Sequence, residues 1–264
     1  MKKFFALLLT VAMLVCSLAS CGGEEAGDLA RVKESGKLVV GVTVYPPMDY
    51  IDDESGEWVG FDAELAQMFA ESLGVNCQIV IIKWKSKVAE INSKQIDLIW
   101  NGMTASDELG AEIDFSVPYA KNAQVVVVKS DSTYTAADVA SLSLAVEDGS
   151  AGHTVASDTI NATTINKVGA QVDALNEVAS GNSQAAVIDL TMAESMLGKG
   201  DYTGLKILDG AKYGEEIFAV GLRKGSDLKE ELDKFLKAKY ADGTMTALLE
   251  KYAVSLNEDA LKSK

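Results

Sequence analysis

Strand-like and helix-like segments alternate along most of the chain, and this alternation constrains the fold more than any other feature. Residues 37–44 (KLVVGVTV) and 96–100 (IDLIW) are apolar runs typical of buried strands. Residues 62–74 (DAELAQMFAESLG) carry apolar side chains at helical spacing and end at a glycine. After the apolar run at 123–129, a second strand–helix set begins at 142–152 (LSLAVEDGSAG). Strands that alternate with helices form parallel sheets, so the sequence predicts two α/β units.

The first twenty residues are predicted to be a secretory signal. Two lysines precede an almost unbroken apolar run at 4–18, which is followed by small residues and Cys21. LASC (18–21) resembles the lipobox of bacterial lipoproteins, in which the cysteine becomes the lipid-carrying N-terminus. We predict a lipid anchor (palmitate) at Cys21, a tether over 21–35 that can end in a short helix, and an extracytoplasmic, membrane-anchored location. The alternative is an ordinary secretory signal with a chance cysteine.

The charge balance limits the possible partners. The chain has 24 basic and 39 acidic residues and a formal net charge of −15, which becomes −17 when the signal with its two lysines is removed. Such an acidic surface argues against nucleic acid and anionic membranes as partners. Cys77 is the only cysteine beyond Cys21, so no intrachain disulfide is expected. Because metal-ligand clusters of the zinc type are absent, we expect no metal and no cofactor.

Eight segments in a fixed order carry a resemblance to a known family, the extracellular solute-binding proteins of family 3, which serve ABC importers of polar amino acids. The match runs from about Gly36 to Ala253. The segments are GKLVVGVTVYPPMDY (36–50), WVGFDAELAQMFAESLGV (58–75), WKSKVAEINSKQIDLIWNGMT (84–104), IDFSVPYAKNAQVVVVK (113–129), LAVEDGSAG (144–152), AAVIDLTMAES (185–195), FAVGLRKG (218–225) and YADGTMTALLEKY (240–252).

The resemblance implies an α/β, two-lobed fold like the type II periplasmic binding proteins, with two parallel-sheet lobes joined by two hinge strands. A small polar solute is then held in the cleft between the lobes, and an ABC permease in the membrane recognises the closed form. Such proteins are usually monomers. The implied limits are 36–118 plus 218–254 for lobe 1, 123–213 for lobe 2, 119–122 and 214–217 for the hinges, and 255–264 for a frayed or short helical tail.

Several candidate site residues follow predicted strands, where ligands of α/β sheets bind. The resemblance assigns aromatic walls to Tyr45, Tyr50 and Trp84, whose alternative role is packing on the core. It assigns ligand contacts to Gly102, Met103 and Thr104, to Ser150 and Ala151 in a turn before a helix, and to Asp189 as the partner of an α-ammonium group. The alternatives are a plain turn at Gly102 and a helix cap at Asp189.

One position departs from the family. The pattern after GMT is Thr-x-x-Arg, whose arginine grips the ligand carboxylate, but the aligned residues are Ser106, Asp107, Glu108 and Leu109. Three interpretations follow. A carboxylate is bound by other groups, including a displaced base such as Lys85 or Lys121; or the ligand is a cation or amine without a carboxylate; or it is a modified amino acid or short peptide.

Other functional classes are less well supported. The same fold occurs in a few secreted dehydratases, but His153 is the only histidine and follows the GSAG turn, so we expect no catalytic residue. A membrane-linked sensor would need further segments after Tyr252. The favoured interpretation is therefore an importer substrate-binding lipoprotein for an amino acid or amino-acid-like zwitterion.

Overall fold

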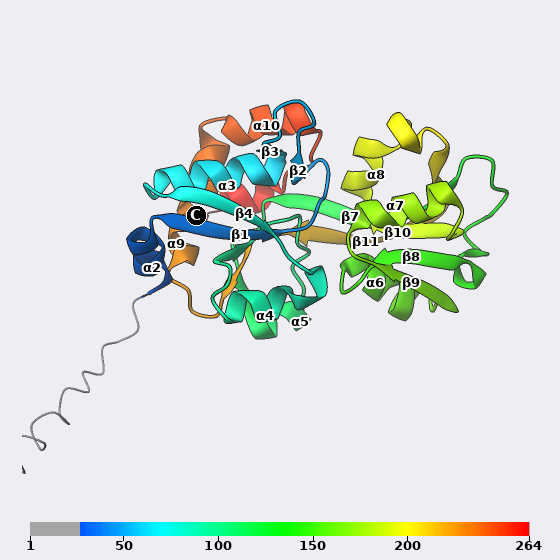
Figure 1. The fold of residues 1–264 in the computed structure, drawn as a ribbon, viewed down its shortest axis with the longest axis horizontal. Helices are drawn as coiled ribbons and strands as arrows, with labels where there is room; N and C mark the ends of the chain where they lie inside the picture. Colours follow the sequence, from blue (N-terminus) through cyan, green and yellow to red (C-terminus); the bar gives the residue numbers. More distant parts are fainter. Residues whose placement is uncertain (1–26, 264) are drawn as a thin grey trace, which may run out of the picture.

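The computed structural model describes residues 27–263, which form two lobes, each built on a five-stranded sheet (Figure 1). In spatial order, the first sheet contains β4 (Asn76–Ile81), β1 (Lys37–Val42), β5 (Leu98–Ile99), β12 (Gly221–Arg223) and β6 (Ile113–Phe115). The second contains β11 (Leu205–Phe218), β7 (Ala120–Lys129), β10 (Ala185–Asp189), β8 (Ser143–Glu147) and β9 (Thr164–Val168). A small separate hairpin pairs β2 (Tyr50–Ile51) with β3 (Trp58–Val59).

Helices cover both faces of each sheet (Figure 1). In the first lobe, α3 (Phe61–Ser72) and α10 (Thr244–Tyr252) lie on one side, and α4 (Lys87–Asn92) and α5 (Asp107–Glu112) lie on the other. In the second lobe, α7 (Gln171–Ser180) and α8 (Leu190–Met196) lie opposite α6 (Ala151–Thr154). The remaining α-helices of the described residues are α2 (Asp28–Ser35), α9 (Leu228–Ala241) and α11 (Glu258–Lys262). No helix within residues 27–263 has the length and apolar character needed to cross a membrane.

The helical spacing seen in the sequence produces the core. On α3, the side chains of Phe61, Leu65 and Phe69 follow one another at intervals of four residues and are buried. Phe69 contacts the rings of Trp100 and Phe235, with centroids 6.4 and 5.2 Å away. One face of α3 therefore packs against both the sheet and the C-terminal helices, which return to the first lobe.

The sheets are mixed rather than purely parallel. β1 runs parallel to β4 and β5, and β8 runs parallel to β9 and β10, as the strand–helix repeats predict. β7 is antiparallel to β10 and β11, and β12 is antiparallel to β5 and β6. The prediction of two parallel-sheet lobes is therefore wrong for these strands. The reason is that β7 and β11 carry the chain between the lobes in opposite directions (Figure 1).

The two crossing strands pair with each other, with Ala120 opposite Phe218 and Asn122 opposite Glu216. The C-terminal segment is joined to the same place, because the Lys121 N–H donates to the Ser255 carbonyl over 2.8 Å. The segment predicted as a tail over 255–264 includes the helix α11, whose Leu261 is buried. The limits of the lobes stay a prediction.

The helix α2 is fixed to the first lobe by buried charges. Val32 is fully buried, and Arg223 on β12 donates from Nε to the two oxygens of Asp28, at 3.1 and 3.0 Å. Arg223 also donates from Nη1 to the carbonyls of Ile91 and Ile96, at 2.6 and 2.8 Å. The tether predicted over 21–35 is therefore a packed helix from Asp28 onward.

We expect Arg223→Met to lower the free energy of unfolding by about 3–5 kcal/mol, because it leaves two buried carbonyl oxygens without their donor and Asp28 with the weaker pairing to Arg31 at 3.5 Å. The control is Lys224→Met, which removes a half-exposed partner of Asp114 and should cost less than about 1 kcal/mol. Urea denaturation of the chain without its signal measures both changes. Equal losses in the two variants would contradict the role of Arg223.

Candidate functional site

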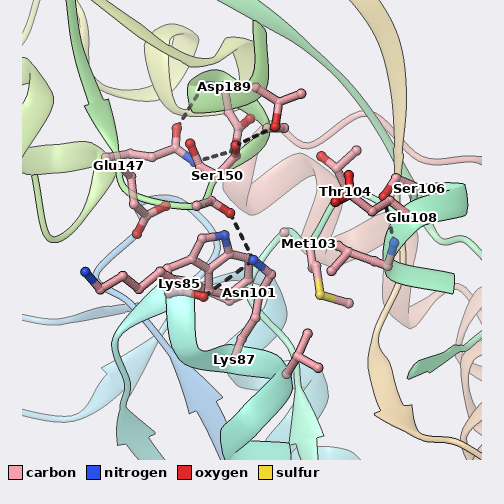
Figure 2. A pocket seen from close by; sticks show the side chains of 18 of the residues that line it. Lys85, Lys87, Asn101, Met103, Thr104, Ser106, Glu108, Glu147, Ser150 and Asp189 are labelled. Atoms are coloured by element: carbon pink, nitrogen blue, oxygen red, sulfur yellow. Dashed lines mark hydrogen bonds between the residues drawn. The ribbon is translucent and has the colours of Figure 1, made fainter. Parts of the chain in front are cut away.

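A cleft of about 830 Å³ lies between the lobes, and both lobes contribute to its walls (Figure 2). Its second-lobe wall contains the last residues of two neighbouring strands, Glu147 of β8 and Asp189 of β10. The first-lobe wall contains the start of α4 and the loop after β5. The cleft therefore lies beyond strand ends, as expected for α/β sheets.

Of the three predicted aromatic residues, two line the cleft. Trp84 starts the 3-10 turn η1 (Trp84–Ser86) and is 7% exposed. Tyr45 is also buried, and its hydroxyl lies beside Asp189; burial and this carboxylate raise the pKa of the tyrosine. Tyr50 does not line the cleft: it lies on β2, pairs with Val59 of β3 and packs on the first-lobe core. The structure thus brings Tyr45 and Trp84 together and leaves Tyr50 out.

The loop after β5 contributes Gly102, Met103 and Thr104 to the cleft. Gly102 has a φ of +54°, and a Cβ there would lie 2.5 Å from the Tyr45 ring, so the glycine makes room for a neighbouring side chain. Its N–H donates to Asp62 Oδ2 over 2.6 Å and is not available to an anion. Thr104 Oγ1 donates to Glu216 Oε2 over 3.0 Å.

Asp189 and Glu216 form an acidic end of the cleft. Asp189 is 3% exposed and accepts hydrogen bonds from the side-chain amides of Asn122 (2.8 Å), Gln171 (2.6 Å) and Gln124. Asp189 stands at the N-cap position of α8, but its side chain makes no capping hydrogen bond. Asn122 and Gln124 also donate to Glu216, at 2.9 and 3.0 Å. Burial raises the pKa of both carboxyl groups, while these amide hydrogen bonds oppose the rise.

Glu147 lines the same cleft and is 3% exposed (Figure 2). Its Oε1 atom is buried without a hydrogen-bond partner, and so is Oε1 of Gln124. Burial raises the pKa of Glu147 to about 8. Buried polar atoms are normally paired, and of these two acceptors only Glu147 Oε1 belongs to a residue that lines the cleft, so it offers a position for a polar group of a ligand.

The lining residues include five acids but only two bases, Lys85 and Lys87. Lys85 is 59% exposed and pairs across the lobes with Asp148, Nζ to Oδ2 over 2.9 Å. Lys121, the other base considered from the sequence, does not line the cleft. Lys87 is 6% exposed and donates to the Gly149 carbonyl over 3.0 Å. Leu109 lines the cleft and packs beside Met103 on an apolar cluster of the first lobe.

Ser150 and Ala151 line the second-lobe wall just after Gly149. A Cβ on Gly149, which has a φ of +81°, would lie 2.9 Å from Lys85 Cα, so the turn contacts the first lobe directly. Ser150 Oγ accepts from the N–H of His153 over 3.1 Å. His153 is bound within this turn, because its Nδ1 accepts from the Gly149 N–H over 3.1 Å. Within residues 27–263, no group of three or more metal-ligating side chains is placed to hold a metal ion.

Three residues of the cleft, Lys87, Glu147 and Glu216, were not predicted from the sequence as site residues. Lys87 had a detectable signal: it lies one helical turn before Ile91, on the side of α4 that becomes buried. Glu147 ends an apolar strand in the same way as Asp189. No local pattern marks Glu216, since it reaches the cleft from a crossing strand.

We expect Glu147→Gln to stabilise the ligand-free protein at pH 8 but not at pH 4. Burial favours the protonated form of Glu147, whose pKa is about 4.5 in the unfolded chain and about 8 in the folded protein. Its contribution to the free energy of unfolding is therefore fully present below about pH 4.5 and is lost as the pH rises to about 8. The gain at pH 8 is on the order of 4 kcal/mol. Denaturant titrations at both pH values measure it. Glu108→Gln, at an exposed acid of the same cleft, should change stability little, and a similar gain there would contradict the burial argument.

Comparison with known proteins places this cleft among solute-binding proteins. The chain is 29% identical to the arginine-binding extracellular protein ArtP of Bacillus subtilis, over 96% of this chain and 98% of that protein. It is 29% identical to the L-cystine-binding protein TcyJ of Escherichia coli, over 90% and 91%. It is also 29% identical to cyclohexadienyl dehydratase of Pseudomonas aeruginosa, but over only 48% and 47%.

A mutant of ArgBP from T. maritima has a similar structure, with a TM-score of 0.79, 30% identity, and coverage of 85% of this chain and 98% of that one. The family model described as bacterial extracellular solute-binding proteins, family 3, matches residues 38–255. The chain therefore belongs to the family 3 extracellular solute-binding proteins of bacteria.

Proposed function

We propose that this chain is the extracytoplasmic substrate-binding lipoprotein of an ABC importer. It captures an amino acid or amino-acid-like zwitterion in the interlobe cleft, acts as a monomer, and delivers the solute to a membrane permease. The family supports the transport role, and ArtP supports the ligand class. The observation that carries the proposal is the carboxylate pair of buried Asp189 and partly buried Glu216, held in place by three side-chain amides.

The carboxylate pair suits an ammonium group. Buried carboxylates are costly unless a cation or hydrogen-bond donors compensate them, and here only neutral amides and a hydroxyl do so. A bound ammonium supplies both charge and donors. Glu147 adds a third acid with an unpaired oxygen. Burial keeps this carboxyl protonated in the empty cleft at neutral pH, and a cation beside it favours the charged form, so the cleft can compensate a second positive group. We therefore favour amino acids with a cationic side chain, such as arginine or lysine.

Contacts between the lobes support capture by closure. Lys85 pairs with Asp148, and Lys87 donates to Gly149, each across the two walls of the cleft. Both contacts lie between the first-lobe turn before α4 and the second-lobe turn before α6. A ligand that touches both walls favours the closed arrangement, because it binds that arrangement more tightly than an open one.

A second candidate ligand is an amine without a carboxylate. It is favoured by Leu109, which cannot donate a hydrogen bond, and by the excess of acids in the cleft. A modified amino acid or short peptide is a further alternative. A dehydratase activity has less support: the relative with that name matches half of the chain, and His153 is not a lining residue of the cleft.

Thermal-shift and calorimetric titrations with L-arginine, L-lysine, L-histidine, L-glutamine and L-cystine test the proposal. At 100 times its Kd, a ligand should stabilise the protein by about 2.7 kcal/mol. We expect Asp189→Asn to weaken binding roughly 100-fold, because a neutral amide leaves the ammonium without its counter-charge. The charge-matched control Glu215→Gln, at an exposed position beside Glu216, should keep the affinity. Unchanged affinity in Asp189→Asn would remove Asp189 from the binding site.

The lipid anchor is tested separately, since Cys21 lies outside the described residues. In bacteria that express the full chain, Cys21→Ser should abolish labelling by radioactive palmitate and release the protein from the membrane fraction. Cys16→Ser, within the predicted signal, should change neither result. If the wild type carries no palmitate, and if Cys21→Ser and Cys16→Ser are found in the membrane fraction to the same extent as the wild type, an ordinary secretory signal is favoured.

A further inference from the structure

We infer that Lys87 is the partner of the ligand carboxylate, in place of the arginine that the family pattern has at the position of Leu109. The cleft then selects α-amino acids over the corresponding amines. This inference rests on the proposed function and adds which group recognises the anionic end of the ligand. It also decides between the two candidate ligand classes, since only an amino acid has a carboxylate to offer.

Lys87 is placed to meet a ligand. It is the first residue of α4, it lines the cleft, and Figure 2 shows its ammonium group pointing toward the second lobe. Nζ donates to the carbonyls of Gly149 (3.0 Å) and Trp84 (3.4 Å) and lies 4.8 Å from the centroid of the Trp84 ring. An ammonium group has three donors, so one remains for a ligand oxygen.

The charge of Lys87 is not matched by these partners. Both hydrogen-bond acceptors are neutral carbonyl oxygens, and the side chain is 6% exposed. A buried ammonium of this kind is costly unless an anion compensates it. Burial lowers the pKa of Lys87, whereas the cleft acids Glu147, Glu108 and Glu112 oppose that effect. A carboxylate that enters the cleft supplies the missing counter-charge.

Residues 87 and 109 together explain the departure from the family. Leu109 follows Ser106 and Glu108 on α5, which lies on the same side of the first sheet as α4 (Figure 1). Its side chain packs on the apolar cluster that contains Trp84 and Met103, so no donor is present there. The buried positive charge on this wall of the cleft therefore comes from Lys87 on α4, the helix beside α5.

The buried lysine and the buried acids lie on opposite walls of the cleft, whereas the first-lobe acids Glu108 and Glu112 are exposed. Lys87 belongs to the first lobe, whereas Asp189 and Glu147 belong to the second (Figure 2). A volume of about 830 Å³ is enough for an amino acid between them. In this orientation the carboxylate lies at the start of α4, and the ammonium group lies at the strand ends of the second lobe.

Three matched pairs of compounds test the inference by calorimetry: L-arginine with agmatine, L-lysine with cadaverine, and L-histidine with histamine. Each second compound lacks only the carboxylate. In the wild type, we expect the best amino acid to bind at least about tenfold more tightly than its amine. Lys87→Met should weaken binding of that amino acid about 10–100-fold and leave the amine within about threefold. The charge-matched control Lys121→Met should behave like the wild type, because Lys121 does not line the cleft.

A second variant tests whether the position of the cation matters. Lys87→Met combined with Leu109→Arg should recover part of the preference for the amino acid, because it returns a carboxylate donor to the same wall. The ligand-free melting temperature of each variant establishes that it is folded. If Lys87→Met does not fold, Lys87→Gln, which keeps a donor for the carbonyl oxygens, takes its place.

The outcomes separate the inference from the proposed function. If amines bind as tightly as amino acids, or if Lys87→Met weakens both members of a pair equally, the inference is wrong but solute binding stands. If Lys85→Met rather than Lys87→Met removes the preference, the carboxylate partner is Lys85 and the inference is wrong. If none of the six compounds binds, the proposed ligand class fails and the inference fails with it.

Discussion

Asp62 is the residue on which the geometry of the cleft depends. Its carboxylate is fully buried near the start of α3, and one oxygen accepts from the Gly102 N–H over 2.6 Å and from the Tyr119 hydroxyl over 2.7 Å. Burial raises its pKa to about 7, and these hydrogen bonds oppose the rise. Asp62 thereby joins three distant segments: a core helix, the loop that lines the cleft, and the residue that precedes the crossing strand β7. The loop then reaches the other crossing strand through Thr104 and Glu216.

This arrangement determines where an anion can bind. The Gly102 N–H, which a ligand carboxylate could otherwise use, is already occupied by Asp62. Residue 109 offers no donor, so the positive charge of the first-lobe wall comes from Lys85 and Lys87, of which only Lys87 is buried. The second-lobe wall supplies the acids, because Glu147 and Asp189 end neighbouring strands of one sheet. Neither lobe alone satisfies a zwitterion, so binding of both ends couples ligand capture to closure of the lobes.

The fold class and the Asp189 position were accessible from sequence because they depend on local patterns: strand–helix alternation, and an acid that ends an apolar strand. The antiparallel direction of β7 and β11 was not accessible from the sequence, because the spacing of apolar residues indicates which side chains are buried but not the direction in which strands pair. Tyr50 was assigned to the cleft from the resemblance, yet it lies in the β2–β3 hairpin and packs on the first-lobe core. The amides that hold Asp189 come from positions 18 to 67 residues away, and no local signal links them to it.

Lys87 and Glu147 show why a binding cleft keeps groups that weaken the empty protein. Each is more than 90% buried, and neither has a hydrogen-bond partner that matches its charge. Against the larger effects of burial, the two groups attract each other across the cleft, which raises the pKa of Lys87 and lowers the pKa of Glu147, and this attraction offsets only part of the cost of burying them. Because the two groups lie on different lobes, a ligand with a carboxylate and a cationic group compensates both at once. If Lys87 binds the carboxylate as we propose, a zwitterion compensates both groups, whereas a simple amine compensates only the acids.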